Sequence, residues 1–262
     1  MARFIWQRSG WPRFRWDASR LLVPLSECRR AQGALLGRTR DLGVGPVRTL
    51  RSSVLVEETV RTAAIEGEVY ERAAVRSSVA RRLGLPTAGL FTPSREIDGL
   101  VQVLLDATTG FEAPLTAVRL HGWHAALFPT GYSGMQRIEV ARWRSSDTPM
   151  RVVSGAVGAE RVHFEAPPTD HVDQEMTAFL SWWETDSRTE DGLLRAALAH
   201  LWFVTVHPYE DGNGRLARVV TEMALAQDEP SEARYYSLSR EVEARRGDYY
   251  AILEQTQRGG LE

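Results

Sequence analysis

The chain has 262 residues, of which 43% are hydrophobic and 25% charged, with 32 basic and 34 acidic side chains. These proportions are typical of a soluble globular protein, and the near-neutral charge gives no electrostatic reason to expect a nucleic-acid or membrane partner. The sequence contains no lysine, which excludes a Schiff base, a Walker-type phosphate loop and a protein-kinase strand lysine. A single cysteine, Cys28, excludes an internal disulfide and a multi-cysteine zinc site, as is usual in a reducing compartment.

The first twenty residues interleave aromatic and basic side chains and contain no apolar run long enough for a signal peptide or a membrane span. A cytoplasmic location is therefore expected. The aromatic residues have two interpretations: a surface on which nucleic acid or a peptide stacks, or an irregular arm whose rings fill a neighbouring apolar face. The neutral overall charge favours the second. These aromatic residues are Phe4, Trp6, Trp11, Phe14 and Trp16.

Apolar residues recur at helical spacing through most of the chain. An amphipathic helix is predicted over 25–42, with Cys28 at one of its apolar positions. A second is predicted over 47–66, and Gly67 is expected at its C-terminal end. The remaining predicted helices span 72–83, 93–108, 116–128, 170–184, 193–206, 215–227 and 241–257.

The segment 129–168 interrupts the helical pattern, because it is rich in Gly, Pro, Ser and Thr. Two β-prone runs, 150–153 and 161–164, flank a glycine-containing turn, which predicts a β-hairpin at about 148–168. The expected fold is therefore mainly α, with one hairpin inserted into it.

The segment 207–218 is the most informative, and it reads His-Pro-Tyr-Glu-Asp-Gly-Asn-Gly-Arg-Leu-Ala-Arg between two apolar helices. A glycine-rich turn that leads into a helix presents unpaired N–H groups and the positive end of the helix dipole, an arrangement suited to phosphate. Arg215 and Arg218 lie three residues apart on the first turn, so both can face this anion site.

Two other side chains of this segment carry chemistry. Asp211 offers a hard oxygen ligand through which Mg²⁺ could bridge to a bound polyphosphate. His207 lies on the opposite rim, and an ordinary imidazole pKa of about 6.5 suits a general base near neutral pH. The alternative is a glycine-capped corner with solvated charges. That alternative does not explain why a base, a metal ligand, a phosphate site and two arginines occur within twelve residues.

These twelve residues resemble the signature of the Fic family, H-x-F-x-[D/E]-G-N-G-R-x-x-R, at every position except the aromatic, where Tyr209 replaces Phe. The tyrosine ring can anchor the loop equally well provided that its hydroxyl finds a partner. The hairpin ending at 162–168 is similar to the flap of these enzymes, and the aromatic arm with its following helices resembles a domain often found ahead of bacterial Fic cores. The resemblance implies a Fic-type catalytic core at 91–262, preceded by a small helical N-terminal domain at 1–90.

The resemblance also implies an activity, the transfer of AMP from ATP to a Tyr, Thr or Ser hydroxyl of a target protein. In that scheme His207 accepts the hydroxyl proton, and Asp211 holds Mg²⁺ on the α- and β-phosphates. Backbone N–H groups of the turn stabilise charge on the α-phosphate, and one arginine each grips the α/β region and the γ-phosphate. The implied phosphate-binding residues are, in chain order, Gly212, Asn213, Gly214, Arg215 for the α/β region and Arg218 for the γ-phosphate.

Partners are implied in the same way. The hairpin edge at 150–164 is expected to dock the target protein by strand addition. A homodimer is left open, and no membrane partner is expected. Related proteins often continue with a final core helix and sometimes a winged-helix module, so the end at Glu262 is interpreted as a candidate truncation. Nucleic acid is expected as a partner only through such a missing module.

Residues 62–67, Thr-Ala-Ala-Ile-Glu-Gly, resemble the inhibitory motif [S/T]-x-x-x-E-[G/N] of Fic proteins that are autoinhibited from the N-terminal side. In that scheme Glu66 pairs with Arg218, and Thr62 and Gly67 complete the motif. A charge-assisted pair is worth about 1.5–3 kcal/mol, which corresponds to a rate penalty of roughly ten- to a hundredfold. The alternative is a solvated glutamate at a helix end that Gly67 caps.

Two other functions remain open. The same site could remove AMP from a modified protein if Glu66 positions a water, or the chain could be a nucleotide-sensing module with little turnover. The presence of His207 and Asp211 favours an enzyme, because a binding module needs no base. His121 and His124, three residues apart, could be metal ligands, but the lack of a third ligand nearby favours packing or hydrogen bonding.

Overall fold

The predicted helices are present in the computed structural model, which describes residues 2–40, 42–86, 91–154, 161–229 and 234–261. Within these residues no helix is both long enough and apolar enough to cross a membrane. The helices are α1 (Ala18–Arg40), α2 (Val44–Ile65), α3 (Arg72–Arg82), α4 (Arg95–Thr109), α5 (Ala117–Leu127), α6 (Val172–Glu184), α7 (Gly192–Val206), α8 (Asn213–Asp228), α9 (Leu238–Ala244) and α10 (Arg246–Arg258), with short 3-10 helices η1 (Ile5–Gln7), η2 (Thr169–His171) and η3 (Asp186–Thr189).

Several helices begin at a side chain that caps their first turn. Ser94 accepts a hydrogen bond from the N–H of Ile97 at the start of α4, and Thr116 does the same for α5. Asp191 caps α7 through the N–H groups of its first two leucines, and Ser237 caps α9. A polar side chain at this position satisfies amide groups that have no partner inside the helix.

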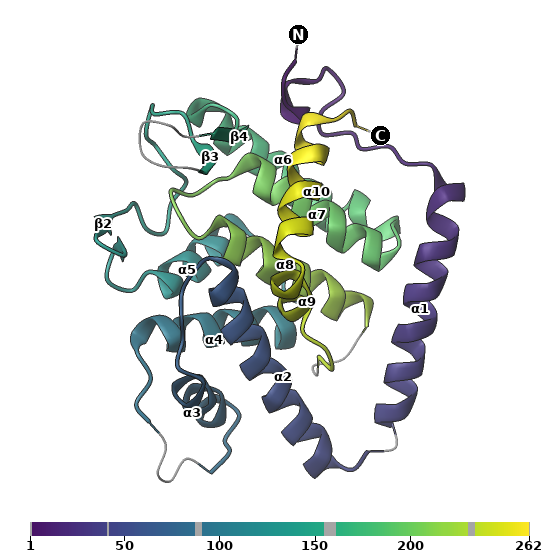
Figure 1. The fold of residues 1–262 in the computed structure, drawn as a ribbon, viewed down its shortest axis with the longest axis vertical. Coiled ribbons are helices and arrows are strands. Elements are labelled where there is room, and N and C mark those ends of the chain that lie inside the picture. The colour runs from purple at the N-terminus through teal and green to yellow at the C-terminus, as the bar shows by residue number, and fades with distance from the viewer. Residues whose placement is uncertain (1, 41, 87–90, 155–160, 230–233, 262) are drawn as a thin grey trace.

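Helix α8 lies at the centre of the fold and contacts α2, α4, α5 and α7 (Figure 1). Every residue from Leu216 to Ala226 is buried, polar ones included. The expectation of a mainly helical protein with an inserted hairpin and a helical N-terminal region is confirmed.

The N-terminal arm packs its rings against the body of the protein, as the second interpretation predicted. Phe4 meets Phe164 edge-to-face with ring centroids 5.1 Å apart, and Trp11 meets Trp202 in the same way at 5.9 Å. The N–H of Arg15 donates to the carbonyl of Leu261 at 2.7 Å, so the described ends of the chain lie side by side (Figure 1).

The first long helix differs from its prediction. Helix α1 begins at Ala18, earlier than expected, and Cys28 is exposed, so its placement on an apolar face was wrong. The reason is that α1 runs along the edge of the molecule (Figure 1). Arg29 attaches α1 there through two ion pairs, one of 2.8 Å to Asp191 and one to Asp228.

The predicted helix 241–257 is divided into α9 and α10 at Arg245, whose backbone (φ −118, ψ 37) leaves the helical region. The break lets α10 change direction and contact β4 and η1 (Figure 1). This change of direction brings α10 to the predicted phosphate corner.

The predicted hairpin consists of antiparallel β3 (Arg151–Ser154) and β4 (Arg161–Glu165), within one residue of the expected bounds. An irregularity between Val152 and Val153 shifts the register. Its turn lies outside the described residues. A second hairpin, β1 (Tyr132–Ser133) and β2 (Gln136–Arg137), was not predicted, because each strand is only two residues long.

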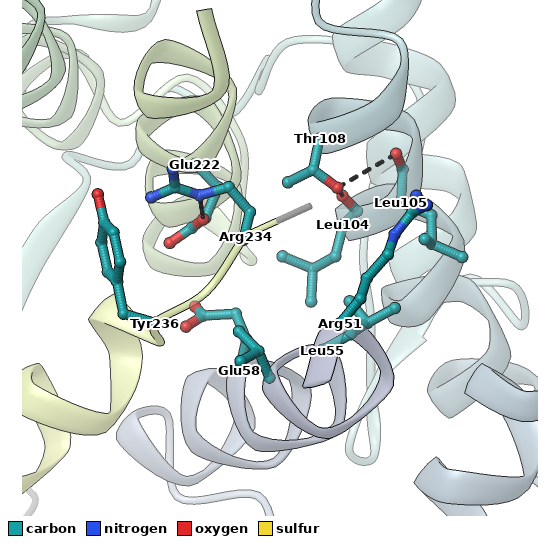
Figure 2. A pocket seen from close by; sticks show the side chains of 10 residues that line it. Arg51, Leu55, Glu58, Leu104, Leu105, Thr108, Glu222, Arg234 and Tyr236 are labelled. Atoms are coloured by element: carbon teal, nitrogen blue, oxygen red, sulfur yellow. Dashed lines mark hydrogen bonds and ion pairs between the residues drawn. The ribbon is translucent and has the colours of Figure 1, made fainter. Parts of the chain in front are cut away.

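Polar side chains of α2, of α8 and of the segment after α8 gather around a small pocket (Figure 2). Glu222 of α8 pairs with Arg234 at 3.0 Å, and burial raises the pKa of Glu222 to about 7. Glu58 of α2 accepts hydrogen bonds from Ser239 in α9. Glu58 thus joins α2 to α9, and the Glu222–Arg234 pair holds the segment after α8 against that helix. Glu222 lies one turn along α8 from Arg218 on the same face, because residues four apart share a helix face.

Candidate active site

The corner between α7 and α8 is built on two left-handed residues. His207 ends α7 at φ 52, and Gly212 precedes α8 at φ 78. A Cβ on Gly212 would lie 2.7 Å from a ring carbon of Phe128, so both the backbone angle and the space require glycine. The predicted turn is therefore present, and it leads directly into α8.

Asn213 and Tyr209 lock this turn from inside. The Asn213 side chain accepts from the Tyr209 N–H at 2.9 Å and donates to the Tyr209 carbonyl at 2.8 Å. The Tyr209 ring is fully buried, and its hydroxyl lies 3.0 Å from Nδ1 of His121. The hydroxyl thus finds the partner that a tyrosine needs at this position.

His124 supports the same loop. Its ring stacks on Tyr209 with centroids 4.1 Å apart. Its Nδ1 accepts from the Ala141 N–H at 3.1 Å, so Nε2 carries the hydrogen that it donates to the Asp211 carbonyl at 3.2 Å. Burial lowers the pKa of His124 to about 4. His121 bonds the Tyr209 hydroxyl and His124 stacks on the Tyr209 ring, which are the packing and hydrogen-bonding roles that the sequence favoured for these two residues.

His207 is oriented as a base. Its Nδ1 lies 3.1 Å from the Val204 carbonyl, which can only accept, so Nδ1 carries the hydrogen and Nε2 keeps its lone pair. Burial lowers the pKa of His207, and the nearby charge of Arg144 acts in the same direction, against Glu66 and Asp211. The imidazole is therefore neutral at pH 7 and able to accept a proton.

Asp211 presents its carboxylate to the cavity that His207 also lines. Its Oδ1 accepts from the Gly212 N–H, and its Oδ2 accepts from the Ser133 hydroxyl of the unpredicted β1–β2 hairpin. Each oxygen keeps a further lone pair, so the carboxylate fits one ligand position of Mg²⁺. The described residues hold no group of three or more His, Cys, Asp or Glu side chains that could bind a metal. An ion here would take its other ligands from phosphate and water.

His207, Asp211, Asn213, Gly214 and Arg218 line one open cavity with about 1640 Å³ of empty volume. Strands β3 and β4 form a second wall of this cavity, and α10 forms a third. The α10 residues were missed at the sequence level, because their helical spacing gave no reason to place them here. They include Tyr249, Tyr250 and Leu253.

Arg218 lies beneath the cavity with only 1% of its side chain exposed, and it meets the end of α2. Its Nη2 donates to Glu66 Oε1 at 2.7 Å, and its Nε donates to the Thr62 hydroxyl at 2.7 Å. Burial by itself would lower the pKa of Arg218. The nearby Glu66 carboxylate raises it, and the net result is a raised pKa. A Cβ on Gly214 would lie 2.2 Å from Glu66 Oε1, so this carboxylate rests directly on the first turn of α8.

Arg215 is not among the residues that line the cavity, although its spacing predicted that both arginines could face the anion site. Its Nη1 pairs with Glu68 at 3.0 Å, and its guanidinium lies 4.8 Å from the Phe128 ring centroid. Gly67, which separates the two glutamates, adopts φ 84 just after α2. Each arginine of the signature therefore meets a carboxylate from the segment that follows α2.

Residues 114–225 match the family described as Fic/DOC, and residues 4–85 match a domain of unknown function, DUF4172. A stretch of 114 residues is 30% identical to protein adenylyltransferase fic-1 of Caenorhabditis elegans, and covers 42% of this chain and 21% of that protein. A stretch of 98 residues is 32% identical to protein adenylyltransferase Fic of Nematostella vectensis, covering 36% and 21%. The matches thus span about a fifth of the length of these relatives.

Solved structures with a similar fold include a Fic domain containing signaling protein from Bacteroides thetaiotaomicron, with a TM-score of 0.64 and 18% identity. That likeness covers 86% of this chain and 80% of the other. A Fic family protein from Desulfovibrio desulfuricans has a TM-score of 0.60 and 23% identity, and the likeness covers 84% and 62%. At these identities the likeness concerns the fold.

Proposed function

We propose that this chain transfers AMP from ATP to a hydroxyl side chain of a target protein, and that Glu66 inhibits the reaction. The proposal starts from the match of residues 114–225 to the Fic/DOC family. The observation that carries the proposal is the placement of the Glu66 carboxylate. It lies on the first turn of α8, paired with Arg218, in the cavity that His207 and Asp211 also line. A site that holds a carboxylate in this way has the donors and the charge to hold a phosphate.

The geometry supports the chemistry of His207. Its free Nε2 accepts the proton of a Tyr, Thr or Ser hydroxyl while the hydroxyl oxygen bonds to the α-phosphorus. The bond between the α-phosphorus and the bridging oxygen to the β-phosphate breaks, and pyrophosphate leaves. First-turn N–H groups of α8, from Asn213 and Gly214, have no partner inside the helix and are placed to stabilise the charge on the α-phosphate.

Charge on the leaving group is met by Arg218, which can bind the γ-phosphate once Glu66 withdraws. Mg²⁺ held by Asp211 would neutralise further charge on the leaving pyrophosphate. The wall formed by Tyr249, Tyr250 and Leu253 offers aromatic and apolar surface on which the adenine base can lie.

The β3–β4 hairpin supports the proposal for the target protein. All four residues of β3 are exposed, and Val152, Val153 and Ser154 also line the cavity. A target segment docked along residues 150–164 would therefore bring its hydroxyl close to the nucleotide, with main-chain hydrogen bonds that tolerate varied sequences.

A second candidate function, removal of AMP from a modified protein, draws on one observation. Glu66 lines the same cavity as His207, so its carboxylate could hold a water for attack on a bound AMP–protein bond. The two activities would use one site and are separated by experiment.

The test compares wild-type protein, Glu66→Gly and the double variant Glu66→Gly/His207→Ala after incubation with α-labelled ATP, Mg²⁺ and a cell lysate. Glu66→Gly is expected to raise protein labelling roughly ten- to a hundredfold, because it frees Arg218, and the double variant to abolish it. Glu112→Gly, which removes an exposed glutamate of the loop before α5, serves as the matched control and should equal the wild type.

Equal labelling by wild type and Glu66→Gly would refute inhibition by Glu66. Nucleotide binding without label in any variant would favour the binding module. If unlabelled wild-type protein removes label from self-modified Glu66→Gly protein, the second candidate function is supported.

A further inference from the structure

One buried arginine outside the signature, Arg144, contacts the carbonyls of three consecutive residues at the end of α7. Its N–H donates to the Pro208 carbonyl at 2.8 Å, its Nε donates to the His207 carbonyl at 2.8 Å, and its Nη2 donates to the Val206 carbonyl at 3.4 Å. Carbonyls at the end of a helix lack partners within it and carry the negative end of its dipole. The guanidinium therefore fixes the backbone from which the His207 side chain projects.

The same guanidinium holds the base of the β3–β4 hairpin. Its Nη2 donates to the Pro167 carbonyl at 2.5 Å, and its Nη1 donates to the Thr169 hydroxyl at 2.9 Å. Both residues lie within four positions of the end of β4. Trp143, the neighbour of Arg144, packs on Tyr209 with ring centroids 5.0 Å apart. The Arg144 side chain thus links the end of the β3–β4 hairpin to the loop that carries His207, the proposed general base.

We propose that Arg144 is a positioning residue, which sets the orientation of His207 and its distance from the hairpin where the target protein docks. This inference rests on the proposed transfer reaction and adds a residue that the signature does not contain.

The burial of Arg144 supports this role. Only 4% of the residue is exposed, and no carboxylate of the described chain forms an ion pair with it. Burial lowers its pKa to about 10, so it remains charged at neutral pH. A buried charge that is balanced only by carbonyls and a hydroxyl is costly. The buried Arg144 charge lies where His207 adopts an uncommon left-handed backbone, at φ 52. Its hydrogen bonds to the neighbouring carbonyls hold that backbone conformation.

Arg144 also acts on His207 through its charge. The groups that bear on the His207 imidazole are Arg144, which adds to burial in lowering its pKa, and Glu66 and Asp211, which raise it. The loss of the Arg144 charge therefore raises the pKa of His207 and keeps the base protonated up to a higher pH.

The test separates position from charge in a Glu66→Gly background. Arg144→Lys keeps the charge but loses the planar fork that reaches both segments, and should lower kcat about 100-fold with the KM for ATP within roughly threefold. Arg144→Gln loses both. It should also shift the acidic limb of kcat/KM, and the NMR titration of His207, about 0.5–1 pH unit upward, whereas Arg144→Lys should leave that titration near its original position.

Arg195 provides a matched control. It is 5% exposed, burial lowers its pKa to about 10, and it donates to Ser187 and Gln227 away from the cavity. Arg195→Lys and Arg195→Gln should lower the melting temperature as the Arg144 variants do, but leave kcat within roughly twofold and the His207 titration unmoved.

Equal losses of kcat in the Arg144 and Arg195 variants, or an unmoved His207 titration in Arg144→Gln, would overturn the proposal. If Glu66→Gly itself transfers no AMP, the proposed function fails. The titration of His207 then still decides whether Arg144 governs this side chain.

Discussion

Two walls of the cavity, the α7–α8 corner and the β3–β4 hairpin, differ in how far their side chains are buried. In the corner, Tyr209, Asn213 and Arg218 are each at most 2% exposed, and hydrogen bonds within the chain hold them. In the hairpin, every residue of β3 is exposed. Glu254 of α10 contacts the hairpin through an ion pair of 3.1 Å to Arg161 and a hydrogen bond of 2.6 Å to Nδ1 of His163.

This difference matches the two demands of the proposed reaction. Phosphoryl-group transfer depends on charges and donors that are in place before the substrate arrives, and the residues proposed to bind ATP lie in the buried, hydrogen-bonded corner. Recognition of a protein segment requires unpaired backbone at an accessible edge, so that part is left open. The comparison predicts that substitutions in the corner lower the rate of AMP transfer. Substitutions at the hairpin should mainly alter the stability of its strands and the docking of the target protein.

The largest expected effect comes from Gly214→Ala, made in the Glu66→Gly background. The added Cβ would occupy the space in which Glu66 Oε1 now lies and would approach Arg218 Nη1 to 3.3 Å. It would therefore exclude a phosphate oxygen, and we expect transfer to fall about 100-fold, as for the loss of one oxyanion donor. The melting temperature should not fall, because alanine favours a helix more than glycine does.

Gly122→Ala is the matched control, since Gly122 lies in α5 with nothing within 4 Å of its added Cβ. It should leave the transfer rate unchanged. Full activity of Gly214→Ala would mean that the phosphates do not bind at the first turn of α8. It would contradict the assignment of the ATP-binding groups to the α7–α8 corner.

The corner was predictable from sequence because its determinants are local. Gly212, Asn213 and Gly214 follow one another, and their conformation depends on neighbours within a few residues. The β3–β4 hairpin was predicted within one residue for the same reason. The fold class also followed from local signals, since the apolar spacing located most of the helices, although it missed the start of α1 and the break between α9 and α10.

Residues that reach the site through tertiary packing were not predictable. Arg144 and Ser133 contact site residues that lie 63 and 78 positions away, Tyr249 lines the cavity from α10, and no periodicity encodes these placements. The break at Arg245 was missed for a related reason, because α10 turns there to pack against β4. The exposure of Cys28 depends on where α1 lies, which the pattern of one helix cannot give.

A smaller effect is expected from Glu254→Ala at the hairpin. Its side chain is 20% exposed, so the ion pairs it makes are partly screened and are worth about 1 kcal/mol. Hydrogen exchange of the β4 amides should become roughly fivefold faster, while the amides of the α7–α8 corner keep their rates. Glu241→Ala, at an exposed glutamate of α9 with a 4.0 Å pair to Arg245, is the control. Equal acceleration in the corner would show that the two sides are one cooperative unit.

The smallest effect on activity is expected from Tyr209→Phe, which introduces the aromatic residue of the Fic signature that this segment resembles. It removes the 3.0 Å hydrogen bond to His121 but keeps the ring stacked on His124. We expect a loss of about 1 kcal/mol of stability and a melting temperature lower by about 2–4 °C, with kcat within roughly twofold, because the backbone of the turn is held by Asn213 and not by the hydroxyl. Tyr236→Phe, which removes a 2.7 Å hydrogen bond to Glu229, should lower stability by a similar amount. A kcat that falls tenfold in Tyr209→Phe alone would show that the hydroxyl, through His121, holds the corner in its active geometry.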